Sequence, residues 1–79
     1  MKKEQKALLY NILRTETQLF YLACKDHWNS ADWAKDAELN KQYNTLEKEY
    51  TAEYGDLPKL QYHEDVVELM ENLKKDLGL

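Results

Sequence analysis

Residues 64–78 read EDVVELMENLKKDLG, and this stretch decides the fold class. Its apolar side chains recur every three or four residues, the spacing of one face of an α-helix. They are Val66, Leu69, Met70, Leu73 and Leu77. Acidic residues come early in the stretch and two lysines come late, as the helix dipole prefers, and a glycine follows as a stop signal. The stretch therefore predicts a helix that begins between residues 59 and 63, at about residue 60, and ends at residue 77.

Two longer segments upstream have the same periodicity. In residues 3–25 a broad apolar face predicts contacts with both other helices. The face consists of Leu8, Leu9, Ile12, Leu13, Leu19, Phe20, Leu22 and Ala23. In residues 30–54 the apolar stripe is rich in tyrosine and consists of Trp33, Ala37, Leu39, Tyr43, Leu46, Tyr50 and Tyr54. We expect Phe20, Trp33 and Tyr43 to lie in the core.

Polar residues and chain breakers separate the three segments. Asn29 or Ser30 is the expected N-cap of the second helix, and the short link before it predicts an antiparallel return. Gly55 and Pro58 end the second helix. Alternating β-branched runs are absent. We therefore expect an all-α protein with one domain, residues 1–79, folded as a three-helix antiparallel bundle with helices at about 3–25, 30–54 and 60–77.

The chain is short and acidic. Small folds of about this size often rely on a disulfide, a metal or a partner chain. Cys24 is the only cysteine, which excludes a disulfide within the chain. The net charge is −4, and residues 29–55 and 56–79 each hold three basic and six acidic residues. Nucleic acid is therefore not an expected partner, because binding it requires neutralisation of phosphates by Lys and Arg.

Two further features bear on location. No stretch approaches the roughly 20 apolar residues that span a bilayer, and the charged start of the chain lacks the apolar segment of a signal peptide. A lone cysteine does not depend on an oxidising compartment. We expect a cytoplasmic protein without membrane contact.

Groups suited to catalysis or metal binding are few. Cys24 and His27 have C-x-x-H spacing, and His63 with Glu64 could complete a four-ligand zinc set, but zinc motifs are richer in Cys and His. Cys24 is more simply explained as a small apolar residue at the end of a buried face. Nothing in the sequence supplies an oxyanion hole or an orienting group for a nucleophile. We expect no enzymatic activity, no metal and no cofactor.

The surplus of aromatic residues is the feature without a chemical explanation. The chain holds six Tyr, two Trp and one Phe, and Tyr and Trp are enriched at binding hot spots. Five of them lie off the main stripes and are our candidate partner-binding residues: Tyr10, Tyr21, Trp28, Tyr54 and Tyr62. Ordinary amphipathic packing, with hydroxyls at the surface, is the alternative explanation.

Together these features predict a small non-enzymatic module for protein–protein interaction or regulation. In composition the chain resembles small accessory proteins of Gram-positive bacteria and of their phages or mobile elements, which implies a protein that modulates or inhibits a host protein. The resemblance covers no motif and implies no residue roles. A structural homo-oligomer, such as a helical dimer, is the alternative. A second alternative is a DNA-associated regulator that uses Lys2, Lys3, Lys6 and Arg14, or an acidic mimic of nucleic acid.

Overall fold

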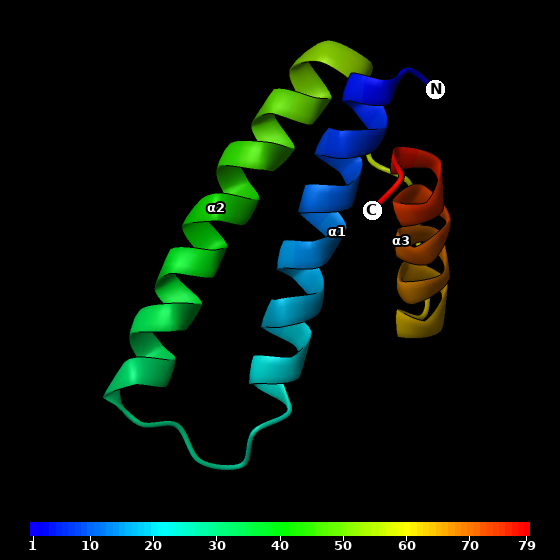
Figure 1. The fold of residues 1–79 in the computed structure, drawn as a ribbon. Coiled ribbons are helices and arrows are strands. Elements are labelled where there is room, and N and C mark those ends of the chain that lie inside the picture. Colours follow the sequence, from blue (N-terminus) through cyan, green and yellow to red (C-terminus); the bar gives the residue numbers. More distant parts are fainter.

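The computed structural model describes all 79 residues as three α-helices without a strand. Helix α1 spans Lys3–Ala23, α2 spans Ser30–Tyr54 and α3 spans His63–Leu77. Helix α1 is central, because it packs against both other helices, whereas no Cα atoms of α2 and α3 lie within 8 Å of each other (Figure 1). None of the helices combines the length and apolar composition needed to cross a membrane. The expected all-α three-helix bundle is confirmed.

Both outer helices run antiparallel to α1. At the start of α1, Lys6 Nζ lies 3.1 Å from Asp76 Oδ2 near the end of α3. In the same region Gln5 Nε2 donates to the Tyr50 hydroxyl, near the end of α2, at 3.0 Å. Helices α2 and α3 therefore point in the same direction, and residues 55–62 lead the chain back along the bundle (Figure 1). We call residues 55–62 the return segment.

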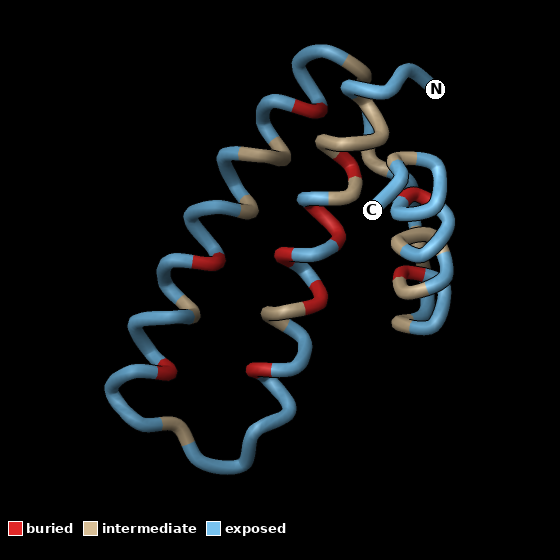
Figure 2. Tube along the Cα trace, viewed as in Figure 1, coloured by how far each residue is buried: buried red, intermediate tan, exposed pale blue.

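The hydrophobic core is thin and lies along α1. Only 11 of the 79 residues are buried, and the core cluster consists of Leu9, Ile12, Leu13, Tyr50, Val66 and Leu73. Leu57 and Leu60 of the return segment pack against this cluster, so the segment covers the core as well as linking two helices. The first half of α2 is mostly exposed (Figure 2).

The ends of α2 carry the expected stop and start signals. The Asn29 side chain accepts a hydrogen bond from the Asp32 backbone N–H at 2.9 Å, and the Asp32 carboxylate accepts one from the Asn29 N–H at 3.1 Å. This reciprocal pair is a capping box, so Asn29 is the N-cap. Gly55 follows the helix with a φ of 88°, a left-handed value that favours glycine.

The observed helix ends lie within two or three residues of the approximate bounds predicted from the sequence. Helix α1 ends at Ala23, two residues before the predicted residue 25, and Trp28 Nε1 donates to the Leu22 carbonyl of its last turn at 3.1 Å. Helix α3 begins at His63, the last position of the predicted window of residues 59–63, and Leu60 packs against the core from the non-helical return segment.

The expected apolar stripe of α2 is wrong in its first two turns. Trp33 is 63% exposed and Ala37 is exposed, whereas Asp32 is buried and Asp36 is half-buried. The reason is helical phase. Steps of three and four residues back from Leu39 lead to positions 36 and 32, and not to 37 and 33.

Three residues expected on the buried face of α1 or at its end are also exposed. Phe20 is 43% exposed, and Ala23 and Cys24 are exposed, so none of them lies in the core. The cause is the length of α3. Its first residue, His63, stacks on Phe20, so α3 provides no cover for the last turn of α1.

Candidate partner-binding surface

Four of the five candidate residues fall into two groups at different ends of the bundle, and Tyr10 lies within α1 between them. Tyr54 closes α2 beside the start of α1, where it lines a hollow with Lys2 and Gln5. Tyr21 and Trp28 lie where α1 ends, and Tyr62 directly precedes α3 at the same end. The structure therefore does not bring all five into one surface.

Tyr10 and Tyr54 are half-buried and pack against the core cluster. The Tyr54 ring lies 5.3 Å from that of Tyr50. Partial burial, together with the charges of Glu53 and Glu4, raises the pKa of the Tyr54 hydroxyl. These two tyrosines thus offer only part of their rings to a partner.

Trp28 has a contact that explains its presence without a partner. Its Nε1 donates to the Leu22 carbonyl, which also accepts a hydrogen bond from the Lys25 backbone N–H, so Trp28 is tied to the end of α1. Its ring lies 4.6 Å from Trp33 at 66°, edge to face. Trp33, expected in the core, instead presents a largely exposed ring on the first turn of α2.

A cluster of four aromatic side chains lies where α1 ends and α3 begins. The Phe20 and His63 rings are stacked, with centroids 3.9 Å apart and planes 11° apart. Tyr21 meets both edge-on, at 5.8 Å from Phe20 and 5.6 Å from His63. Tyr62 precedes His63 and, like Tyr21, is 59% exposed. We call Phe20, Tyr21, Tyr62 and His63 the aromatic cluster.

Of these four residues, Tyr21 and Tyr62 are among the candidates predicted from the sequence, but Phe20 and His63 are not. Phe20 fits the apolar face of α1, so its periodicity predicts burial. His63 was considered only as a metal ligand. The two rings stack because of the position of α3 along α1. No local sequence pattern predicts that position.

Three of the four aromatic side chains line a groove of about 450 Å³ between α1, the return segment and α3. Phe20, Tyr62 and His63 share it with aliphatic side chains such as Leu60 and Val66. Glu16 is the only carboxylate in the lining, and no Lys or Arg takes part in it. The groove is therefore apolar and aromatic, with a single negative charge.

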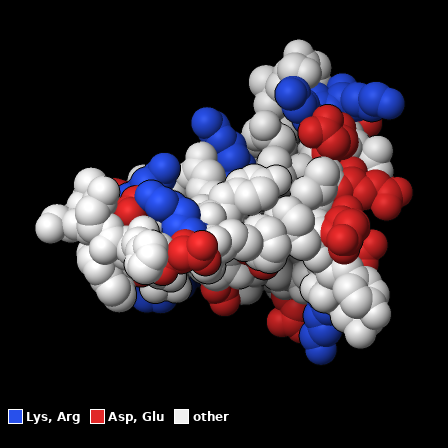
Figure 3. All heavy atoms as spheres, turned by 90° about the horizontal axis from the view of Figure 1, so that it is seen from below, with Lys and Arg blue, Asp and Glu red and all other residues white.

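The surface beside the groove is acidic. Glu64, Asp65, Glu68 and Glu71 of α3 are exposed, and none belongs to either of the two ion pairs in the structure. Figure 3 views the bundle from the end where the α1–α2 link lies. An uncharged area crosses the middle of that view, and acidic side chains gather on the right, on the side of α3.

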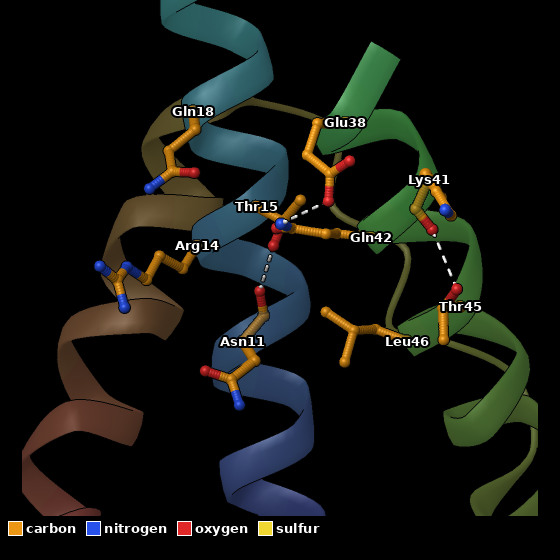
Figure 4. A pocket seen from close by; sticks show the side chains of 9 residues that line it. All are labelled: Asn11, Arg14, Thr15, Gln18, Glu38, Lys41, Gln42, Thr45 and Leu46. Atoms are coloured by element: carbon orange, nitrogen blue, oxygen red, sulfur yellow. Dashed lines mark hydrogen bonds between the residues drawn. The ribbon is translucent and has the colours of Figure 1, made fainter. Parts of the chain in front are cut away.

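A second hollow, of about 530 Å³, lies between α1 and α2 and is lined mainly by polar residues. Several of these residues form hydrogen bonds with one another: Thr15 Oγ1 donates to the Asn11 carbonyl at 2.9 Å, and Gln42 Nε2 donates to Glu38 Oε1 at 3.3 Å. Its two cationic side chains, Arg14 and Lys41, extend to opposite sides (Figure 4). Because the cations do not converge, this hollow has no arrangement suited to a charged ligand.

Groups for chemistry are not assembled elsewhere. No three His, Cys, Asp or Glu side chains are placed so that they could hold a metal ion. The ring of His63, one of the four residues considered above for a zinc site, stacks on Phe20. No family model, no curated protein and no solved structure matches the chain.

Proposed function

We propose that this chain is a non-enzymatic protein-binding module and that the aromatic cluster is its contact surface. The observation that carries the proposal is the exposure of large rings at one site: Phe20 is 43% exposed, and Tyr21 and Tyr62 are each 59% exposed. Large aromatic side chains supply much of the binding energy at protein interfaces. A partner that covered these rings would remove their apolar surface from water.

Most other aromatic residues have a structural role within the bundle. Tyr50 is buried and bonded to Gln5, and Trp28 caps the last turn of α1. Tyr43 packs against the core. In contrast, Tyr21 and Tyr62 are each 59% exposed, and neither packs against the core cluster. Packing against the core or a hydrogen bond therefore accounts for the first group, whereas Tyr21 packs only edge-on against Phe20 and His63.

Affinity capture from a lysate of the source organism tests the proposal. The tagged wild-type chain is compared with the double variant Tyr21→Ala/Tyr62→Ala, and Trp33→Ala serves as the matched control. Trp33 is an equally exposed aromatic residue that does not line the groove. Far-UV circular dichroism checks that all three chains are equally helical, as expected for substitutions at the surface.

We expect a stoichiometric partner that is retained by the wild-type chain and by Trp33→Ala and is lost by the double variant. A partner retained equally by the double variant would show that the aromatic cluster is not the contact surface. Recovery of no protein by the wild-type chain would also contradict the proposal.

A further inference from the structure

We infer that the groove beside the aromatic cluster receives a basic, apolar segment of a partner protein, with an Arg or Lys side chain placed near Glu16. This inference rests on the proposed function and adds the chemistry of the partner. It requires two features in one segment: a cation for the groove carboxylate and aliphatic side chains for the Phe20 and Tyr62 rings.

The charge in the groove is not compensated from within the chain. Glu16 is exposed, lines the groove and forms no ion pair. Lys59 lines the adjoining hollow together with Glu16, but the two side chains form no ion pair. The negative charge of Glu16 also acts on Tyr43. Burial raises the pKa of the Tyr43 hydroxyl most, and the charges of Glu16 and Glu47 raise it further. A cationic side chain from outside would complete the pair.

The charge of α3, which contributes His63 and Val66 to the groove, reinforces this preference. Helix α3 presents Glu64, Asp65, Glu68 and Glu71 before its first basic residue, Lys74. A partner surface of the same sign would be repelled, and one of opposite sign would be attracted during its approach. A cation within the groove also gains from the ring faces, because aromatic faces attract Arg and Lys.

A second copy of the chain fits the groove less well. In a two-fold dimer the same patch faces itself, so the acidic residues of two α3 helices would be brought toward each other. On the other side of Tyr21 lie Lys25 and Lys35, but Lys25 is already paired with Asp32 at 2.8 Å. One free lysine does not balance the four carboxylates of α3.

Three synthetic peptides test the inference by isothermal titration calorimetry. The first repeats Arg-Arg-Leu-Leu, the second replaces each Arg with Glu, and the third replaces each Leu with Ser. Each is titrated into the wild-type chain, into Glu16→Gln and into Glu49→Gln. Glu49 is a matched control, because it is an exposed glutamate on α2 outside the groove.

We expect the Arg-Leu peptide to bind at least about tenfold more tightly than either other peptide, since both the charge and the apolar contact are required. Glu16→Gln should weaken its binding by about two- to fivefold, the usual range for an exposed ion pair, and raised salt should reduce that difference. Glu49→Gln should leave the affinity unchanged.

The outcomes separate this inference from the proposed function. Equal binding of the Arg-Leu and Glu-Leu peptides, with both weakened by Tyr21→Ala/Tyr62→Ala, would refute the basic partner and retain the aromatic surface. Peptide binding that the double variant leaves intact would contradict the aromatic surface itself. Equal effects of Glu16→Gln and Glu49→Gln would refute the position of the cation. Self-association by sedimentation equilibrium that the double variant abolishes would identify a second copy as the occupant instead.

Discussion

Replacement of Leu9 by alanine should destabilise the bundle far more than replacement of Trp33, although tryptophan is the larger residue. Leu9 is 0% exposed at the centre of the core cluster, whereas Trp33 is 63% exposed and contacts Trp28 edge-on. Loss of a buried leucine side chain and formation of a cavity cost about 2–5 kcal/mol. Loss of one aromatic pair at the surface costs about 0.5–1.5 kcal/mol.

The difference is large on the scale of this fold. At about 0.05–0.15 kcal/mol per residue, a chain of 79 residues has a free energy of unfolding of about 4–12 kcal/mol. Leu9→Ala therefore removes a large fraction of the stability and leaves a marginal bundle. Trp33→Ala leaves most of the stability in place.

Urea unfolding followed by far-UV circular dichroism measures both variants. Linear extrapolation yields the free energy of unfolding, and similar slopes for the two variants would show that the same surface is exposed on unfolding. A cost for Trp33→Ala equal to or above that of Leu9→Ala would refute the reasoning. It would place Trp33 in the core and shift the inward face of α2 from Asp32 and Asp36 to positions 33 and 37.

Three further predictions concern the helix ends and the core. Asn29→Ala removes the N-cap acceptor of α2 and should lower the free energy of unfolding by about 1 kcal/mol, measured by urea unfolding. Tyr50→Phe removes the acceptor of the Gln5 bond and should cost about 0.5–1.5 kcal/mol in the same assay, with no loss if the bond does not form. The hydrogen bonds from Lys25 and from the Asn29 backbone lower the pKa of Asp32. Its contribution to stability is therefore fully present above the unfolded pKa of about 3.9 and is lost as the pH falls through the lower folded value. Thermal unfolding between neutral pH and pH about 2 should show a steeper acid loss for the wild-type chain than for Asp32→Asn, and parallel curves would contradict this.

The sequence predicted best where local rules decide the structure. The stripe of α3, the cap at Asn29 and the break at Gly55 depend on residues within one or two turns of each other, and the structure confirms them. Helix boundaries were predicted less exactly where tertiary contacts compete with helix propensity. Leu60 packs against the core from the return segment, and this contact holds the chain out of a helix until His63.

Prediction of the inward face of α2 failed because hydrophobicity was used to set its phase. Trp33 and Ala37 look like core residues, but the true inward positions of the first two turns hold Asp32 and Asp36. Asp32 tolerates this position because Lys25 and the Asn29 backbone satisfy its carboxylate. A buried polar residue with local hydrogen-bond partners can therefore occupy an inward position that the apolar pattern assigns to its neighbour. These partners become visible only in the folded segment between α1 and α2.

The direction of α3 was also beyond a reading of the sequence. A connection of this length can place α3 either antiparallel or parallel to α2. The composition of the connection does not distinguish the two orientations. Here Leu57 and Leu60 settle the matter, because their burial against α1 draws the return segment along the core. Helix α3 then begins beside Phe20, and the aromatic cluster is a consequence of that path.

The position of the aromatic cluster also bears on the stability of the bundle. Helix α1 has both α2 and α3 beside it as far as Phe20, and only α2 beyond it. A partner on the groove would cover Phe20 and Tyr62 and would extend the apolar core past the start of α3. Any ligand that binds only the folded state stabilises it by RT ln(1 + [L]/Kd), where [L] is the free ligand concentration. In a chain whose core contains so few buried residues, a partner bound at the proposed surface therefore also stabilises the fold.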